Sequence, residues 1–150
     1  MRRRLETDNA VAMTDEELIR AYYDHFNARR LADAAALLAD DAHLEHRNLD
    51  LVRNGSENYR LFARRWLDAF PDLRLTIERI DHVRGEWHEV HLLGEGTQTG
   101  DFDMGPLGMV KATNKHGHMR LRHLLQVHDG KIASSTLSFD TNDLIRQISR

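Results

Sequence analysis

The sequence predicts an α+β fold in which helices come first and a curved antiparallel sheet follows. Apolar residues recur at helical spacing up to Pro71, and from Leu73 onward they alternate with polar residues. Helices followed by a run of long strands are typical of α+β domains, in which the helices cover one face of an antiparallel sheet. A chain of 150 residues is large enough to bury a core and enclose a cavity.

The domain is expected to begin at residue 14. Residues 1–13 show no periodicity, and we expect a disordered extension there and a single domain over residues 14–150. Thr14 and Glu17 have the spacing of a capping box, in which each side chain accepts a hydrogen bond at the start of a helix. The apolar stripe of this first helix is Leu18, Tyr22 and Phe26.

Two further helices and a short strand are expected before Pro71. The second helix has its apolar positions at Leu31, Ala34, Leu37 and Leu38. Residues 42–47 read as a brief strand that places His46 on the same face as Leu44. Ser56 follows a turn and is expected to cap the third helix. The apolar stripe of that helix is Tyr59, Phe62, Trp66 and Phe70.

Four long strands and a closing helix are expected after Pro71. The phase of alternation changes between Ile77 and Ile80, which indicates a β-bulge. The expected strands are residues 73–80, 87–99, 118–128 and 131–139. Residues 100–114 form a glycine-containing loop that is long enough to be a lid. A short helix is expected over residues 144–148.

The composition excludes several classes of protein. A net charge of −3 provides no basic surplus for a nucleic-acid backbone. No cysteine is present, so disulfides, thiolate metal sites and cysteine nucleophiles are excluded. No apolar run reaches the roughly 18 residues that span a membrane, and no apolar segment of a signal peptide follows Arg4. A cytoplasmic protein without nucleic-acid or membrane partners is therefore expected.

Four fragments, taken in order, resemble the SnoaL-like polyketide cyclases of the nuclear transport factor 2-like superfamily. They are Tyr23-Asp24-His25-Phe26-Asn27, Ala69-Phe70-Pro71-Asp72-Leu73, Gly96-Thr97-Gln98-Thr99-Gly100-Asp101-Phe102 and the tail from Asp129 to Ile148. The resemblance implies a cone-shaped curved sheet around an apolar pocket, closed by the N-terminal helices. It also implies a homodimer formed through the outer face of the sheet.

The same resemblance implies a cofactor-free aldol cyclisation of a polyketide. In these cyclases an aspartate on the last strand is the acid/base, and a histidine on the preceding strand assists it. Aligned on the Asp129 to Ile132 turn, the assisting histidine falls on His123 and the aspartate falls on Leu137, which cannot carry a proton. The family's Gly-Thr-His pattern has Gln98 in place of its histidine. The fold and His123 are therefore carried over, and the cyclase acid/base is not.

Three residues are candidates for catalysis. His123 shares its strand face with four apolar residues, where desolvation would keep the imidazole neutral and able to accept a proton; the alternative is a hydrogen-bonded core histidine. His46 would donate a hydrogen bond to a carbonyl, or it would simply reach solvent at a strand end. Asp140 is the acid nearest to the lost aspartate, although the same position suits an N-cap of the last helix.

The expected substrate-binding residues are apolar or aromatic, and each has an alternative interpretation as plain core. They are Tyr22, Trp66, Phe102 and Met104. Histidine pairs three residues apart, such as His43 and His46, lie on predicted strands and point to opposite faces, whereas His116 and His118 share one face. No carboxylate completes a recognisable ligand triad, so no metal and no other cofactor is expected.

Two functions remain open from the sequence. The first is a cofactor-independent enzyme that begins a cyclisation, isomerisation or dehydration of a small hydrophobic carbonyl compound by removing a proton with His123. The alternative is a non-catalytic, dimeric small-molecule-binding module that has lost the cyclase aspartate. Hydrolysis of an epoxide is disfavoured, because inward-facing positions do not supply an Asp-Arg-Asp arrangement.

Overall fold

The computed structural model describes residues 13–148 as four helices and eight strands. The helices are α2 (Asp15–Asn27), α3 (Leu31–Ala35), α4 (Tyr59–Ala69) and α5 (Thr141–Ile148). The strands are β1 (Leu38–His46), β2 (Leu51–Asn54), β3 (Arg74–Arg84), β4 (Trp87–Thr97), β5 (Phe102–Asp103), β6 (Met109–Val110), β7 (His116–His128) and β8 (Lys131–Phe139). The expected disordered extension lies, apart from Met13, outside the described residues. None of the described helices is long and apolar enough to span a membrane.

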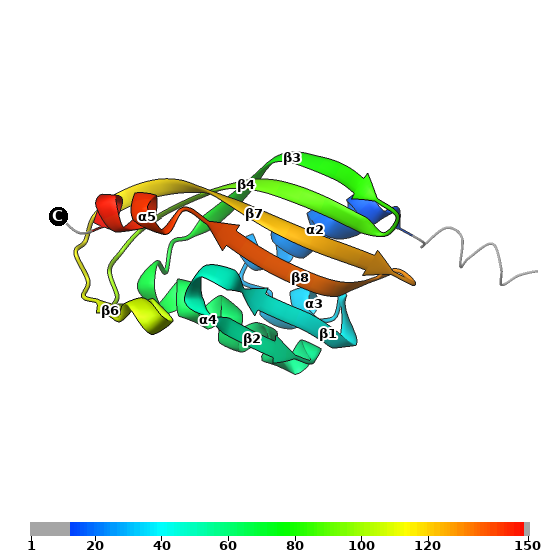
Figure 1. The fold of residues 1–150 in the computed structure, drawn as a ribbon, viewed down its shortest axis with the longest axis horizontal. Helices are drawn as coiled ribbons and strands as arrows, with labels where there is room; N and C mark the ends of the chain where they lie inside the picture. Colours follow the sequence, from blue (N-terminus) through cyan, green and yellow to red (C-terminus); the bar gives the residue numbers. More distant parts are fainter. Residues whose placement is uncertain (1–12, 149–150) are drawn as a thin grey trace, which may run out of the picture.

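Six strands form one curved sheet in the order β2-β1-β8-β7-β4-β3. The sheet arches over α2, α3 and α4, and α5 lies at one end of it beside β7 (Figure 1). This arrangement confirms the predicted α+β fold with a curved sheet closed by the N-terminal helices. One pairing was not predicted: β1 runs parallel to β8, whereas all other neighbours in the sheet are antiparallel.

Helix α2 begins and ends with side-chain hydrogen bonds. The capping box is confirmed, since the Glu17 amide donates to Thr14 Oγ1 at 3.1 Å and the Thr14 amide donates to Glu17 Oε1 at 2.9 Å. At the other end, the Asn27 side chain bonds both the N–H and the C=O of Leu75 at 2.8 Å. These bonds attach the end of the helix to β3 and so fix how α2 lies across the sheet.

The segment between α2 and α4 differs from the prediction in two places. The second helix stops at Ala35, and Leu37 and Leu38 lead directly into β1, which therefore begins four residues earlier than predicted. The predicted Ser56 cap is wrong: Ser56 opens a turn of 3-10 helix, and α4 follows at Tyr59 without a side-chain cap. Propensity at a helix start is weak enough to be overridden by the packing of the flanking β2 and α4.

The bulge in β3 and the alternation of buried and exposed residues along β7 agree with the prediction. The phase change in β3 is a register shift between Ile77 and Arg79 against β4, as expected for a bulge. In β7, Met119, Leu121, His123, Leu125 and Val127 are buried, while Arg120 and Arg122 on the other face are exposed. His123 therefore points toward the helices.

Residues 100–114 are not a simple loop. They contain the β5–β6 hairpin, and the side chains of Phe102 and Met104 are fully buried. The buried Gln98 amide donates to the carbonyls of Val110 at 3.0 Å and Lys111 at 3.2 Å, which holds the hairpin against the body of the domain. The segment thus forms part of the core, and its predicted role as a lid is not supported by this packing.

Candidate functional site

A cavity of about 100 Å³ lies between the inner face of the sheet and helices α2 and α4, with α5 at one end. Its lining is almost entirely apolar and aromatic, and it includes both predicted histidines, His46 and His123. Glu95 and His118, which are exposed, mark its rim near α5. An apolar cavity with a few converging polar groups is the usual form of a small-molecule site.

His123 is buried and bonded to a tyrosine. The Tyr23 hydroxyl lies 2.6 Å from Nδ1 of His123, and both side chains are almost inaccessible to solvent. Burial lowers the pKa of His123 from 6.5 to about 4, because the charged imidazolium loses its hydration. The ring is therefore neutral at pH 7 and can accept a proton on one nitrogen.

His46 lies on the same side of the sheet with a different partner. The indole N–H of Trp66 donates to Nδ1 of His46 at 3.3 Å. The pKa of His46 is well below its usual value, through burial first and then through the neighbouring His123 and Arg65. An indole can only donate, so Nδ1 must carry a lone pair and the single proton of the neutral ring sits on Nε2. His46 is thus a hydrogen-bond donor through Nε2.

The two histidines flank one residue. In the sheet register Leu137 pairs with His123 on β7 and with His46 on β1. Residues that are paired in register across neighbouring strands point to the same face. The cavity wall therefore presents imidazole, leucine and imidazole in one row, with Leu137 at the position where the resemblance placed the missing aspartate.

Three tyrosine hydroxyls lie beside this row. The rings of Tyr22 and Tyr59 are 5.6 Å apart, and those of Tyr22 and Tyr23 are 5.2 Å apart. Burial raises the pKa of all three well above 10, so the hydroxyls stay protonated. Tyr22 is also hydrogen-bonded to Ser135 of β8. On this side, the hydrogen-bond donors and acceptors that the cavity offers are therefore all neutral.

Asp140 lies elsewhere and has a structural role. Its exposed carboxylate accepts a hydrogen bond from the Asp143 amide at 3.2 Å, which makes it the N-cap of α5. It does not line the cavity. The interpretation of Asp140 as a catalytic acid is therefore replaced by the cap interpretation.

The predicted substrate-binding residues divide into two pairs. Tyr22 and Trp66 line the cavity. Phe102 and Met104 do not: Phe102 packs behind Trp66, with ring centroids 4.9 Å apart, and both residues are fully buried. They support the wall from outside and are not positioned to contact a ligand.

Tyr23 is the site residue that sequence reasoning missed. It follows Tyr22 in the chain and lies outside the i, i+4 stripe of Leu18, Tyr22 and Phe26. Ile19 and Tyr23 are themselves four residues apart and equally buried, so a second stripe widens the apolar face of α2. A tyrosine inside such a wide face is the signal that could have identified it.

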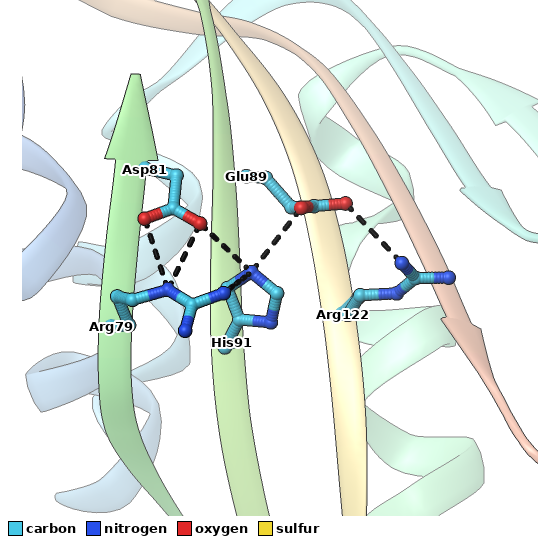
Figure 2. A network of polar contacts seen from close by, with 5 residues as sticks. All are labelled: Arg79, Asp81, Glu89, His91 and Arg122. Carbon is cyan, nitrogen blue, oxygen red and sulfur yellow. Dashed lines mark hydrogen bonds and ion pairs between the residues drawn. The ribbon is translucent and has the colours of Figure 1, made fainter. Parts of the chain in front are cut away.

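One group of described residues has the composition of a metal site. Asp81, Glu89 and His91, on the outer face of the sheet, bring three ligand atoms within 4.8 Å of one another. Figure 2 shows that Arg79 contacts Asp81 and His91, while Arg122 contacts Glu89. The two guanidinium groups already balance the two carboxylates. We therefore describe the group as a surface charge network.

A curved sheet closed by helices over an apolar cavity is the fold of the nuclear transport factor 2-like class, and solved structures share it with this chain. Within that class, the chain belongs to the SnoaL-like polyketide cyclase family, whose profile matches residues 16–148. No curated protein sequence matches the chain at a significant level.

Solved structures share this fold at low identity. A candidate polyketide cyclase from Pseudomonas putida is 24% identical, with a TM-score of 0.74 over 91% of this chain and 99% of that one. AclR, a candidate hydroxylase from Streptomyces galilaeus, is 19% identical, with a TM-score of 0.72 over 89% and 94%. A protein from Catenulispora acidiphila with a ketosteroid isomerase-like fold, solved with trimethylamine, is 15% identical, with a TM-score of 0.74 over 91% and 95%.

Proposed function

We propose that the protein is a cofactor-independent enzyme that removes a proton next to the carbonyl group of a small hydrophobic compound. The observation that carries this proposal is the pairing of His123 with Tyr23 in an apolar cavity, 2.6 Å apart. His46 adds a second neutral imidazole on the same wall. Family membership supports the reaction class, which comprises cyclisation, isomerisation or dehydration.

In the proposed first step, His123 is the general base. The step requires the tautomer of His123 in which Nδ1–H donates to the Tyr23 oxygen, because this tautomer leaves a lone pair on Nε2 for the proton of the substrate carbon. The electron pair of the broken C–H bond moves toward the carbonyl and forms an enolate. His46, which must carry its proton on Nε2, donates to the developing oxyanion. The enolate then attacks a second carbonyl, is protonated elsewhere, or expels a β-hydroxyl group.

A second candidate function follows from Leu137. Where the cyclases keep an aspartate, this wall is apolar, so the alternative is a binding module without chemistry. The cavity is small: at about 100 Å³ it lies below the roughly 150 Å³ that encloses one benzene ring, so a one-ring ligand would extend toward the exposed rim at Glu95 and His118. Trp66 and Phe102 do not fill the pocket. About 100 Å³ of free space therefore remains, and a binding module would use it to hold a ligand.

The two functions can be separated without knowing the natural substrate. We would incubate the protein in D₂O with small aryl ketones and 1,3-diketones and follow deuterium incorporation at the α carbon by NMR. The enzyme should accelerate exchange over buffer, and His123→Gln should lower the rate by about 10²–10⁴. The catalytic function would be rejected if deuterium exchange were no faster with the protein than in buffer for every compound, or if His123→Gln left the rate unchanged. The binding module would then remain.

Homodimerisation through the outer face of the sheet is part of this proposal. That face carries the charge network of Figure 2 together with the partly buried Trp87, Leu93 and Leu124. Sedimentation velocity should give a dimer, and Leu93→Glu should shift it toward monomer. A monomer at micromolar concentration would contradict the proposed assembly.

A further inference from the structure

Leu137 separates two imidazoles on the wall of the cavity. Neighbouring strands lie about 4.8 Å apart, so His46 and His123, on the strands either side of Leu137, both face the space in front of it. Leu137 is 4% exposed and lines the cavity itself. Any ligand group resting on Leu137 would therefore meet an imidazole on each side.

The described residues place no carboxylate inside this space. Glu45 and Glu95 are the acids among the lining residues, and strand alternation points both outward, since their neighbours Leu44, His46, Gly94 and Gly96 face inward. The Glu45 carboxylate lies 3.2 Å from Nε2 of His43 and 3.7 Å from Nε of Arg47. Glu95 is exposed at the rim.

The other ionisable groups around the pair are tyrosines and one arginine. Helix α2 contributes Tyr22 and Tyr23, and helix α4 contributes Tyr59 and Arg65. The Arg65 guanidinium lies 3.4 Å from Asp103, so its charge is partly compensated outside the cavity. Strand β8 contributes Leu137 and Ser135, and β7 contributes His118 only at the rim. The interior thus contains bases and neutral donors, and it lacks a counter-ion for an imidazolium.

An anion entering the cavity would supply that missing counter-ion. Without it, charging either histidine is opposed by desolvation, and charging both is opposed by their mutual repulsion. A carboxylate between them would make one imidazolium favourable, because an opposite charge within a few ångströms stabilises the charged form. The second histidine could still donate a neutral hydrogen bond. Binding would then take up one proton from solvent.

We propose that Leu137 makes this pocket selective for small aromatic acids, which bind as anions between His46 and His123 with uptake of one proton. The proposal rests on the proposed function in that it assigns the ligand class to the same pocket. An aromatic carboxylate resembles the enolate of the proposed reaction in charge and planarity. An aspartate at position 137 would provide the anion internally and would favour neutral ligands instead.

Benzoate and its neutral isostere benzamide test the proposal by isothermal titration calorimetry. At pH 7 benzoate should bind at least tenfold more tightly than benzamide. Its heat of binding should differ between phosphate and Tris buffers by the amount expected for one proton taken up. Because one proton is linked to binding, the affinity should fall about tenfold per pH unit above neutrality.

Two variants of equal size locate the effect at one residue. Leu137→Asp should abolish the preference for benzoate, whereas Leu137→Asn, which is polar but uncharged, should keep it. Should Leu137→Asp fail to fold, which circular dichroism would show, His123→Gln provides the second test and should remove the proton uptake. Three results would each overturn the proposal. They are equal affinities of the wild type for benzoate and benzamide, benzoate binding without proton uptake, and no benzoate binding.

The outcomes also separate this inference from the proposed function. Proton-linked benzoate binding without any deuterium exchange would leave the ligand class intact and reject catalysis. Deuterium exchange without proton-linked benzoate binding would reject the ligand class and leave catalysis intact.

Discussion

The hydroxyl of Tyr23 on α2 and Nδ1 of His123 on β7 are 2.6 Å apart, although 100 positions separate the two residues in the chain. The bond joins the first described helix to the central part of the sheet inside the cavity. It fixes the orientation of the imidazole, and it satisfies a polar atom that would otherwise be buried in an apolar wall. The same bond therefore serves stability and the proposed chemistry.

Tyr23→Phe should destabilise the protein by about 1–3 kcal/mol, because it leaves the buried His123 nitrogen unsatisfied. Urea denaturation measures the change. In a His123→Leu background the same substitution should cost much less, since both polar partners are then absent. A cost that is equal in the two backgrounds would show that the hydrogen bond contributes little.

Stability should fall as the pH drops below 6.5. The folded-state pKa of His123 is about 4, against 6.5 for an unperturbed histidine, so between these values the unfolded chain binds a proton that the folded protein does not. The free energy of unfolding should decrease by about 3 kcal/mol over this window, from this residue alone. His46 acts in the same direction.

The control for this pH effect is His123→Gln, which should flatten the decrease measured by denaturation between pH 7.5 and 4. His128 works in the opposite direction, because Glu86 raises its pKa, but it is exposed and its effect should be small. A pH profile that is unchanged in His123→Gln would contradict the assignment.

Asp140→Ala should destabilise the protein by about 1 kcal/mol through loss of the α5 cap, and Asp140→Asn should be nearly neutral, because asparagine is an equally good cap. Thermal denaturation distinguishes the two variants. Both should retain any α-carbon exchange activity. Loss of activity in a stable Asp140→Asn protein would return this residue to the catalytic candidates.

Helix α5 should be loosened by adding a methyl group to Gly117. The Gln147 side chain accepts from the His118 amide at 2.9 Å and donates to its carbonyl, so it continues the hydrogen-bond ladder of β7 beyond the end of β8. A Cβ on Gly117 would lie 2.7 Å from Gln147 Oε1 and displace this amide. In Gly117→Ala the His118 amide should exchange with D₂O about tenfold faster, as expected for a loss of about 1.4 kcal/mol.

Gln147→Ala provides the matched control for this contact. It should accelerate exchange at His118 to a similar extent, and the double variant should be no faster than either single one. Additive effects would mean that Gly117 and Gln147 act independently.

The parts of the structure that depend on local pattern could be predicted from the sequence. The inward direction of His123 follows from the alternation along β7, the bulge in β3 follows from a phase change, and the start of α2 follows from Thr14 and Glu17. Each of these signals involves residues within a few positions of one another. They can therefore be recognised in the sequence without knowledge of how the elements pack.

The contacts that build the site could not be predicted in this way. The partner of His123 depends on how α2 is docked by Asn27, and the neighbour of His46 depends on α4 bringing Trp66 to it. The burial of Phe102 depends on where the β5–β6 hairpin lies against α4. The row around Leu137 requires the parallel pairing of β1 with β8, which no local pattern encodes.

That parallel pairing has a consequence for how the protein is made. Strands β1 and β8 are far apart in the chain, so His46 comes to lie beside Leu137 only after about ninety residues of intervening chain have been closed into a loop. Pairings of such long range are intrinsically slow to form, because the loop must be closed before the contacts are gained. During synthesis, β1 cannot pair with β8 until residues 131–139 have left the ribosome. The part of the pocket wall that holds His46, Leu137 and His123 is thus completed only once β8 is available.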